Sequence, residues 1–247
     1  MGEVSVQFLG SGDAFGSGGR FHTCIYVRSE ETQVLVDCGA SSLVAMKRSG
    51  LDTSTIDAIL LTHLHGDHFG GLPFFILDAQ YISLRKKPLV VAGPPGLEAR
   101  IREATEVLYP GSYETQRDFP IEFVELEEET ATQIEPLTVT PYCVVHPSGA
   151  PPYALRVVLE DKVIAYSGDT QWTDALIPAA NEADLFICEC NFYEESAGYH
   201  LDYHTLMDHW AELGCHKLVL THMNEEMLRR IESLEVEGAE DGKRYVL

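Results

Sequence analysis

The segment from Thr62 to Gly71 constrains this chain more than any other, because it places four candidate metal ligands within six residues. His63, His65, Asp67 and His68 follow directly on an apolar run that predicts a strand. Side chains at positions i and i+2 of an extended segment point to the same side, so the first two histidines can converge on one point. A turn at the intervening glycine directs the other two ligands toward a neighbouring point. The spacing therefore predicts two adjacent metal sites.

Three more candidate ligands stand directly after apolar, β-forming runs elsewhere in the chain. They are His146, Asp169 and His222. A fold that builds a metal site at its strand ends would draw the remaining ligands from such positions. Imidazole and carboxylate groups suit Zn²⁺, Mn or Fe, and seven ligands are too many for one tetrahedral ion. We therefore expect two divalent metal ions, Zn²⁺ first and Mn or Fe as alternatives, with room for water or substrate.

Strand-like and helix-like segments alternate along the whole chain. β-forming runs predict strands at residues 4–9, 23–28, 32–37, 57–62, 88–92, 121–126, 137–145, 154–159, 162–167, 184–188 and 217–221. Helices are expected at residues 41–49, 71–83, 96–108, 173–180, 204–213 and 224–234. This pattern, without a repeat of fixed period, predicts an α/β fold in which helices cover sheets in layers. The acidic stretch 125–135 indicates a solvated turn rather than a boundary, so residues 1–247 are expected to form one domain.

Charge and cysteine content exclude several classes of protein. Seventeen basic residues against 39 acidic ones give a net charge of −22, which repels polyanions, so extended nucleic acid is not the expected partner. The six cysteines lack the density of a disulfide scaffold. The N-terminal residues lack the features of a signal peptide, and no window approaches the length of a membrane span. We expect a cytoplasmic protein that does not act at a membrane.

The candidate ligands, taken together, resemble motifs of the metallo-β-lactamase superfamily. The motifs are Thr-His-Leu-His-Gly-Asp-His at 62–68, His146, Ser-Gly-Asp-Thr at 167–170 and Thr-His at 221–222. The resemblance implies a four-layer αββα sandwich with a dinuclear site at one edge. It also implies one ion on His63, His65 and His146, a second on Asp67, His68 and His222, and Asp169 as a bridge. Phosphodiesterases, RNase Z and glyoxalase II share such a bridge and the lactamases do not, which argues against antibiotic hydrolysis.

Within the superfamily, the chain resembles the ribonuclease Z-like branch. The similarity lies in residues 8–12 and 36–39, in Glu189 and in His204-Thr205, where the branch has a His-Ser-Thr element and this chain lacks the serine. It implies that Glu189 and His204 form an acid pair beside the metals. RNase Z enzymes carry a long tRNA-gripping arm between the motifs that correspond here to His146 and Asp169. Only 22 residues, 147–168, separate these motifs here, so that arm is not expected.

The expected function is a dinuclear metal-dependent hydrolase, specifically a phosphodiesterase acting on a small cyclic or linear nucleotide-like phosphodiester. A metal-bridging hydroxide would attack phosphorus, Asp67 would ligate and orient it, and His204, held by Glu189, would protonate the leaving oxygen. The alternatives are a ribonuclease Z-type tRNA 3′-end endonuclease, a thioester hydrolase of the glyoxalase II kind, and a catalytically silent metal-binding protein. The expected partner is a small anionic ester. Related enzymes are often dimers, so a homodimer is one arrangement that the resemblance allows.

Overall fold

The computed structural model describes residues 2–194 and 198–247, and their strands form two mixed sheets of seven. The first sheet has the order β14-β1-β2-β3-β4-β5-β6. Its strands are β1 (Ser5–Gly10), β2 (Cys24–Arg28), β3 (Gln33–Val36), β4 (Ala58–Leu60), β5 (Leu89–Gly93), β6 (Ile121–Glu125) and β14 (Arg244–Val246). Strands β3 to β6 are parallel, and Val36 lies beside Leu60, so the residues after β3 and β4 meet at one edge.

The second sheet has the order β13-β12-β11-β10-β9-β8-β7. Its strands are β7 (Thr132–Ile134), β8 (Leu137–Cys143), β9 (Tyr153–Leu159), β10 (Lys162–Tyr166), β11 (Leu185–Glu189), β12 (Leu218–Thr221) and β13 (Glu237–Gly238). Strands β10 to β13 run parallel, and Glu189 lies beside Thr221. The segments that carry Asp169, Glu189 and His222 therefore leave the sheet at the same edge.

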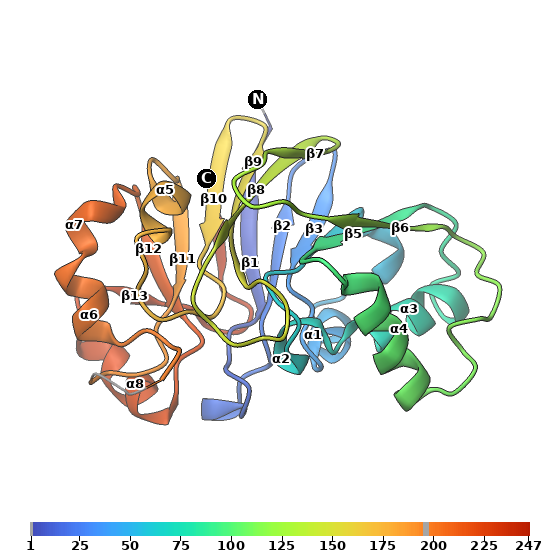
Figure 1. Ribbon diagram of the computed structural model, residues 1–247, viewed down its shortest axis with the longest axis horizontal. Coiled ribbons are helices and arrows are strands. Elements are labelled where there is room, and N and C mark those ends of the chain that lie inside the picture. The colour runs from blue at the N-terminus through green and yellow to red at the C-terminus, as the bar shows by residue number, and fades with distance from the viewer. Residues whose placement is uncertain (1, 195–197) are drawn as a thin grey trace.

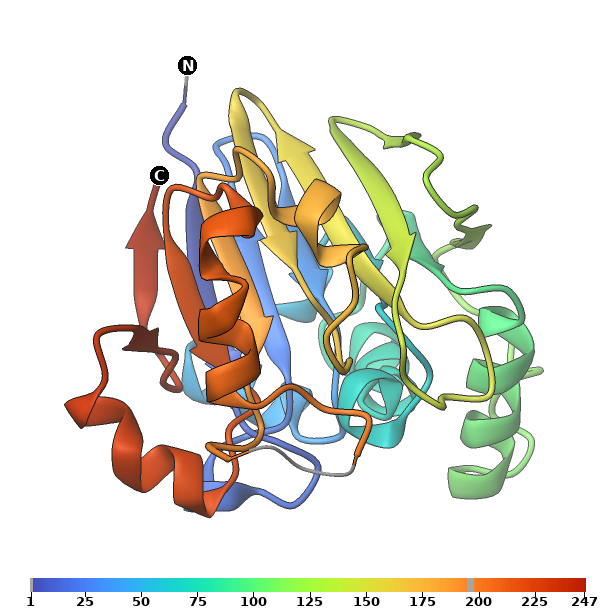
Figure 2. The ribbon, with the colours of Figure 1, turned by 60° about the vertical axis from the view of Figure 1, so that its left-hand side comes forward.

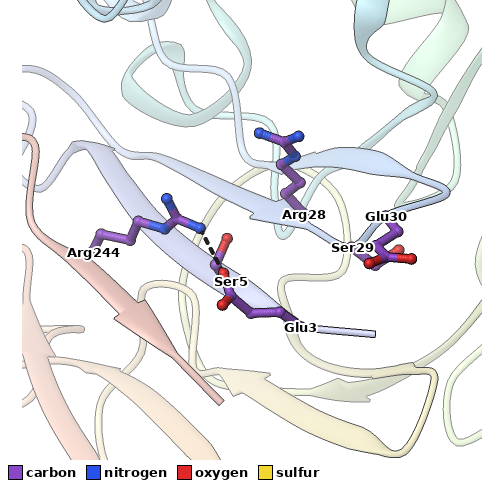
Figure 3. A pocket seen from close by; sticks show the side chains of 6 residues that line it. All are labelled: Glu3, Ser5, Arg28, Ser29, Glu30 and Arg244. Atoms are coloured by element: carbon purple, nitrogen blue, oxygen red, sulfur yellow. Dashed lines mark hydrogen bonds and ion pairs between the residues drawn. The ribbon is translucent and has the colours of Figure 1, made fainter. Parts of the chain in front are cut away.

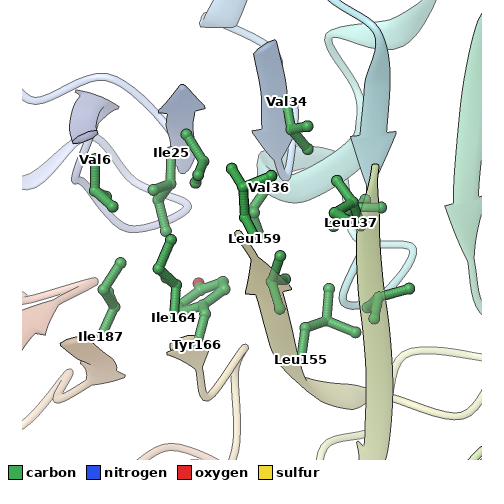
Figure 4. Packing of buried hydrophobic residues seen from close by; sticks show 14 of the residues in the cluster. Val6, Ile25, Val34, Val36, Leu137, Leu155, Leu159, Ile164, Tyr166 and Ile187 are labelled. Atoms are coloured by element: carbon green, nitrogen blue, oxygen red, sulfur yellow. The ribbon is translucent and has the colours of Figure 1, made fainter. Parts of the chain in front are cut away.

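The main core lies between the two sheets. Alternation along the first strand sends Val4, Val6 and Phe8 into this layer, where each is fully buried, and turns Ser5 and Gln7 to the other face. Figure 4 shows side chains of the first sheet, such as Val6, meeting those of the second, such as Ile187. Two aligned sheets that share one apolar layer place both sets of strand ends side by side.

Helices cover the outer face of each sheet, as Figures 1 and 2 show. The first sheet carries α1 (Ser42–Arg48), α2 (Gly66–Phe69), α3 (Leu72–Tyr81) and α4 (Leu97–Leu108), and the second carries α5 (Leu176–Ala180), α6 (Tyr203–Asp208), α7 (Trp210–Leu213) and α8 (Glu225–Arg230). Short 3₁₀ turns are η1 (Ser17–Gly19), η2 (Thr53–Thr55) and η3 (Ile231–Ser233). The layers confirm the predicted αββα sandwich. Among the described residues, no helix has the length and apolar character needed to cross a membrane.

The predicted elements differ from the observed ones mainly at helix ends and sheet edges. The helix expected at 204–213 is broken at His209, whose backbone leaves the helical range (φ −100°, ψ 2°) while its ring stacks on Trp172. The helix expected at 224–234 ends at Arg230 and continues as a 3₁₀ turn. The short strands β7, β13 and β14 were not predicted, since two or three residues carry too little pattern. The acidic stretch 125–135, expected to be a solvated turn, instead contains the last residue of β6 and all of β7.

Candidate metal centre

The turn after β4 carries the His-x-His-x-Asp-His segment into the space where the strand ends meet. His65 is the N-cap residue of α2 and keeps an extended backbone (φ −86°, ψ 152°). Asp67 and His68 lie in the single turn of α2 that follows. The change from extended to helical backbone gives the two pairs of ligands different directions, as the sequence predicted. Of the four, His63 and His68 are fully buried.

The structure brings the predicted ligands together in two groups. The ligand atoms within each group lie within 4.8 Å of one another, and the groups are His63, His65 and His146, and Asp67, His68, Asp169 and His222. In the first group, His146 Nε2 lies 3.1 Å from His65 Nδ1. In the second, Asp67 Oδ2 lies 3.2 Å from both His68 Nε2 and His222 Nε2. The first group has the residues that the superfamily resemblance implied for one ion, and the second has those implied for the other ion together with Asp169.

Asp169 is placed between the two groups. Its Oδ2 atom lies 3.8 Å from His63 Nε2 and 3.9 Å from His146 Nε2 on one side, and 3.5 Å from His222 Nε2 on the other. Gly168, with φ of 59°, makes the turn that delivers this carboxylate, and a Cβ there would lie 2.6 Å from the Tyr153 carbonyl oxygen. One carboxylate within reach of both groups is the geometry that a bridging ligand needs.

Asp37 orients ligands of both groups. Its carboxylate binds His68 Nδ1 at 2.7 Å and accepts hydrogen bonds from the backbone N–H and the hydroxyl of Thr62, both at 2.8 Å. The Thr62 hydroxyl also lies 3.0 Å from His63 Nδ1. Fixing the Nδ1 atoms leaves the Nε2 atoms of His63 and His68 buried and, among the described residues, without hydrogen-bond partners. Such convergent, unpartnered nitrogens fit a metal, because ligating histidines are held through the other ring nitrogen.

Two residues of this site hold backbone conformations that residues other than glycine rarely adopt. Asp37 has φ of 59° and His222 has φ of 57°, both in the left-handed region. The backbone of His222 is held by Ser11, whose carbonyl accepts its N–H, and by Asn191, whose amide donates to its carbonyl. Strain of this kind persists where the surrounding structure enforces it, commonly at functional sites.

Electrostatics favour ionised carboxylates and one neutral imidazole. Burial opposes ionisation of Asp67, but His68 and His222 outweigh it and lower its pKa. Burial acts the same way on Asp169, and His222 and His68 bring its pKa well below the usual range. Burial, reinforced by His68, lowers the pKa of His63 well below the ordinary value. Against burial, Asp169 and Asp67 raise the pKa of His68 and of His222, so a metal bound by these two imidazoles would displace their protons.

Glu189 pairs with His200, and the predicted pairing with His204 is wrong. Glu189 is fully buried at the end of β11, where Oε1 lies 2.9 Å from His200 Nδ1 and accepts the Thr170 N–H at 2.6 Å. The His200 ring lies 4.9 Å from that of His146. Burial lowers the pKa of His200, but hydrogen bonding and charge from Glu189 outweigh it and raise the pKa to about 9.

His204 lies away from the metal-ligand groups, on the surface of α6. Its side chain is 52% exposed and its Nε2 atom is 3.7 Å from the Glu194 carboxylate. The physical reason is the helix start: Asp202 caps α6 by accepting the Thr205 N–H, so the chain has already left the site when it reaches His204. Sequence reasoning therefore missed His200, and it also missed the roles of Asp37 and Thr62. Asp37 follows an apolar strand directly, the same signal that identified His146.

The polar pocket in Figure 3 is a different feature of the molecule. It has a volume of about 280 Å³ and is lined by Glu3, Ser5, Arg28, Ser29, Glu30 and Arg244. Arg244 is paired there with Glu3 at 3.1 Å. Ser5 begins β1, whereas the metal-ligand groups lie past the other end of that strand, where Ser11 contacts His222. This pocket is therefore separate from the candidate metal centre.

Comparison with known proteins supports the same class of molecule. A family model described as "Anti-Pycsar protein Apyc1" matches residues 4–240. Ribonuclease Z of Methanosarcina acetivorans is 26% identical, with 94% of this chain and 91% of that protein covered. The probable metallo-hydrolase YhfI of Bacillus subtilis is 26% identical over 89% of this chain and 87% of its own.

Solved structures give the same fold. Human tRNase Z, short form, is similar with a TM-score of 0.78 and 26% identity, covering 98% of each chain. The crystal structure of YhfI, at 24% identity, has the same TM-score and covers 99% of this chain and all of that one. With the two clusters of His and Asp, these similarities describe a metal-dependent hydrolase. The chain belongs to the family of the anti-Pycsar protein Apyc1, in the ribonuclease Z-like branch of the metallo-β-lactamase superfamily.

Proposed function

We propose that this protein is a phosphodiesterase for a small cyclic or linear nucleotide-like phosphodiester. The observation that carries the proposal is the Asp169 carboxylate, which lies within 4 Å of ligand atoms of both groups, next to an independently built Glu189–His200 pair. The first group would hold one divalent ion and the second another, with Zn²⁺ as the first candidate. Ions bound there would lower the pKa of a coordinated water and stabilise negative charge on phosphoryl oxygens.

Asp67 is proposed to orient the attacking water. Its carboxylate is ionised because His68 and His222 lower its pKa, and its Oδ2 atom already contacts both imidazoles. An oriented carboxylate beside the reacting phosphorus can accept a hydrogen bond from the water and fix its line of attack.

His200 is proposed as the proton donor to the leaving oxygen. Glu189 holds the Nδ1 side of the ring, and its hydrogen bond and negative charge raise the pKa of His200 and so favour the protonated imidazole. Because Nδ1 is engaged, the Nε2–H is the group free to donate. A positioned general acid contributes about 100-fold to 10,000-fold where the leaving group is poor. This role, expected from the sequence for His204, passes to His200.

Two metal ions per chain are the first expected result. Protein purified without chelator should contain close to two equivalents of transition metal by elemental analysis, because seven convergent ligands exceed one tetrahedral shell. Reconstitution with Zn²⁺, Mn²⁺ and Fe²⁺ in parallel identifies the ion that supports turnover. A single tightly held ion, unchanged by added metal, would contradict the dinuclear proposal.

Precursor tRNA is expected to be a weak substrate. Residues 147–168, between His146 and Asp169, form β9, β10 and their flanking turns. The alignment with M. acetivorans ribonuclease Z spans 286 positions, so that relative carries inserted segments. The three basic residues at 85–87 also make contacts within the chain, so they are not free to bind RNA. Arg85 is buried and donates to backbone carbonyls, Lys86 pairs with Asp118, and Lys87 pairs with Asp57.

The measurement is cleavage of precursor tRNA at physiological salt beside a panel of cyclic nucleotides, linear diesters and a thioester. The proposal expects turnover of small diesters and weak or absent cleavage of tRNA. Efficient tRNA cleavage would instead support the ribonuclease Z-type activity that the names of the relatives suggest. Thioester turnover without diester turnover would support the glyoxalase II-like alternative.

We also propose that a second copy of the chain covers the apolar face beside α3 and α4. Ile82, Leu84 and Val107 are 69%, 63% and 81% exposed there, and packing against a second copy would remove these apolar side chains from water. Light scattering should report a dimer for the native chain and a monomer for Val107→Asp. A monomeric native chain at micromolar concentration would contradict the proposal.

A further inference from the structure

A second, smaller cavity adjoins His200. Its volume is about 230 Å³, and its lining includes Gln171, Trp172, His200, Leu201, Asp202 and Thr205. The His200 ring lines this cavity, and its centroid also lies 4.9 Å from that of the His146 ring. Any group bound in the cavity would be next to the metal-ligand groups.

The cavity walls are fixed by contacts that also fix His200. Glu189 Oε1 accepts the Thr170 N–H and binds His200 Nδ1, so the segment leading to Gln171 and the imidazole share one anchor. The Gln171 N–H donates in turn to the Val145 carbonyl at 3.2 Å. The Trp172 indole stacks on His209, with centroids 4.0 Å apart and planes at 9°. A rigid aromatic wall loses little entropy when it binds a ring.

The polar groups of the cavity suit a neutral ligand with hydroxyl groups. Each Asp202 carboxylate oxygen accepts one hydrogen bond from Thr205, at 2.8 Å and 2.7 Å, and retains capacity for another. The exposed Gln171 side chain offers both a donor and an acceptor. The same carboxylate repels phosphate. Aromatic stacking together with acceptors for hydroxyl donors is the chemistry that binds a nucleoside.

We propose that this cavity binds the leaving-group side of the substrate, as a neutral nucleoside whose ring contacts Trp172 and whose hydroxyls bond Asp202 and Gln171. The inference rests on the proposed function, in which His200 protonates the leaving oxygen. A general acid must lie within hydrogen-bond reach of that oxygen. The organic group attached to it is therefore beside His200, which lines the cavity. Substrates with further phosphates on this side bind poorly, because Asp202 faces them.

The chain offers a direct optical test, because it contains only two tryptophans, Trp172 and Trp210. Trp210→Phe leaves Trp172 as the sole fluorophore in the cavity, and Trp172→Phe leaves Trp210 outside it. Titration of each metal-loaded variant with adenosine or uridine should quench the first saturably and leave the second unchanged. Inorganic phosphate should not reproduce the quenching. Absence of saturable quenching in Trp210→Phe, or equal quenching in both variants, overturns the proposal.

Steady-state kinetics provide a second test of the nucleoside site. Trp172→Ala should raise KM for a nucleoside diester by about tenfold with little change in kcat, as expected for loss of one stacking contact, and Trp210→Ala should leave both values unchanged. If the native chain hydrolyses no phosphodiester yet Trp172 is quenched, the proposed function falls and the nucleoside site stands. If diesters are hydrolysed but Trp172 does not respond and KM does not change, the nucleoside site alone is wrong.

Discussion

Replacing Asp169 by alanine is expected to remove at least one metal ion and nearly all activity. Its Oδ2 atom lies within 4 Å of ligand atoms of both groups, so the substitution deletes a ligand from each side at once. Loss of a residue that merely orients a ligand typically costs about 10-fold to 100-fold in affinity or activity, so loss of a shared ligand should cost more than about 100-fold. Elemental analysis and turnover of a small diester measure the two effects.

Asp174→Ala is the matched control for Asp169→Ala. Asp174 lies five residues further along the same loop and is exposed, so its removal should change neither metal content nor rate. Circular dichroism of both variants separates loss of metal from loss of fold. An Asp169→Ala protein that retains two ions and its activity would mean that this carboxylate does not bridge the two groups.

Replacing His200 by alanine is expected to leave the metal content intact and to slow hydrolysis in a way that depends on the leaving group. For a poor leaving group such as a ribose alkoxide, the rate should fall about 100-fold or more, because that oxygen needs a proton as it departs. An activated p-nitrophenyl ester should lose much less, since p-nitrophenolate leaves without a proton. The ratio of the two losses isolates proton donation from general damage to the site.

His204→Ala is the internal control, because it removes the same side chain four residues along the chain. The 52% exposed His204 faces Glu194, so its loss should leave both substrates nearly unaffected. Equal losses on both substrates in His200→Ala would indicate that His200 positions the substrate rather than protonating it. A loss in His204→Ala that depends on the leaving group would show that His204, the residue first expected from the sequence, donates the proton.

The sequence by itself predicted the sandwich and a candidate set of metal ligands. Spacing within residues 63–68 is a local property, because backbone geometry over six residues fixes which side chains can converge. His146, Asp169 and His222 could also be predicted, because each follows an apolar run in the sequence. In the structure His222 comes directly after β12, and His146 and Asp169 come three residues after β8 and β10. The period-two burial of Val4, Val6 and Phe8 likewise needed only the pattern.

Only the tertiary structure decided which histidine pairs with Glu189. His200 and His204 both follow β11 within a short span, and no local pattern distinguishes them. The choice depends on the path of the chain across the sheet: Phe192 pairs with Asp202 in a β-bridge, and Asp202 then caps α6, so His200 stays over the buried carboxylate and His204 turns to solvent. The Asp37 network required the fold for the same reason, since it joins side chains from different strand ends. Contacts between residues distant in sequence follow from packing, which a local pattern does not encode.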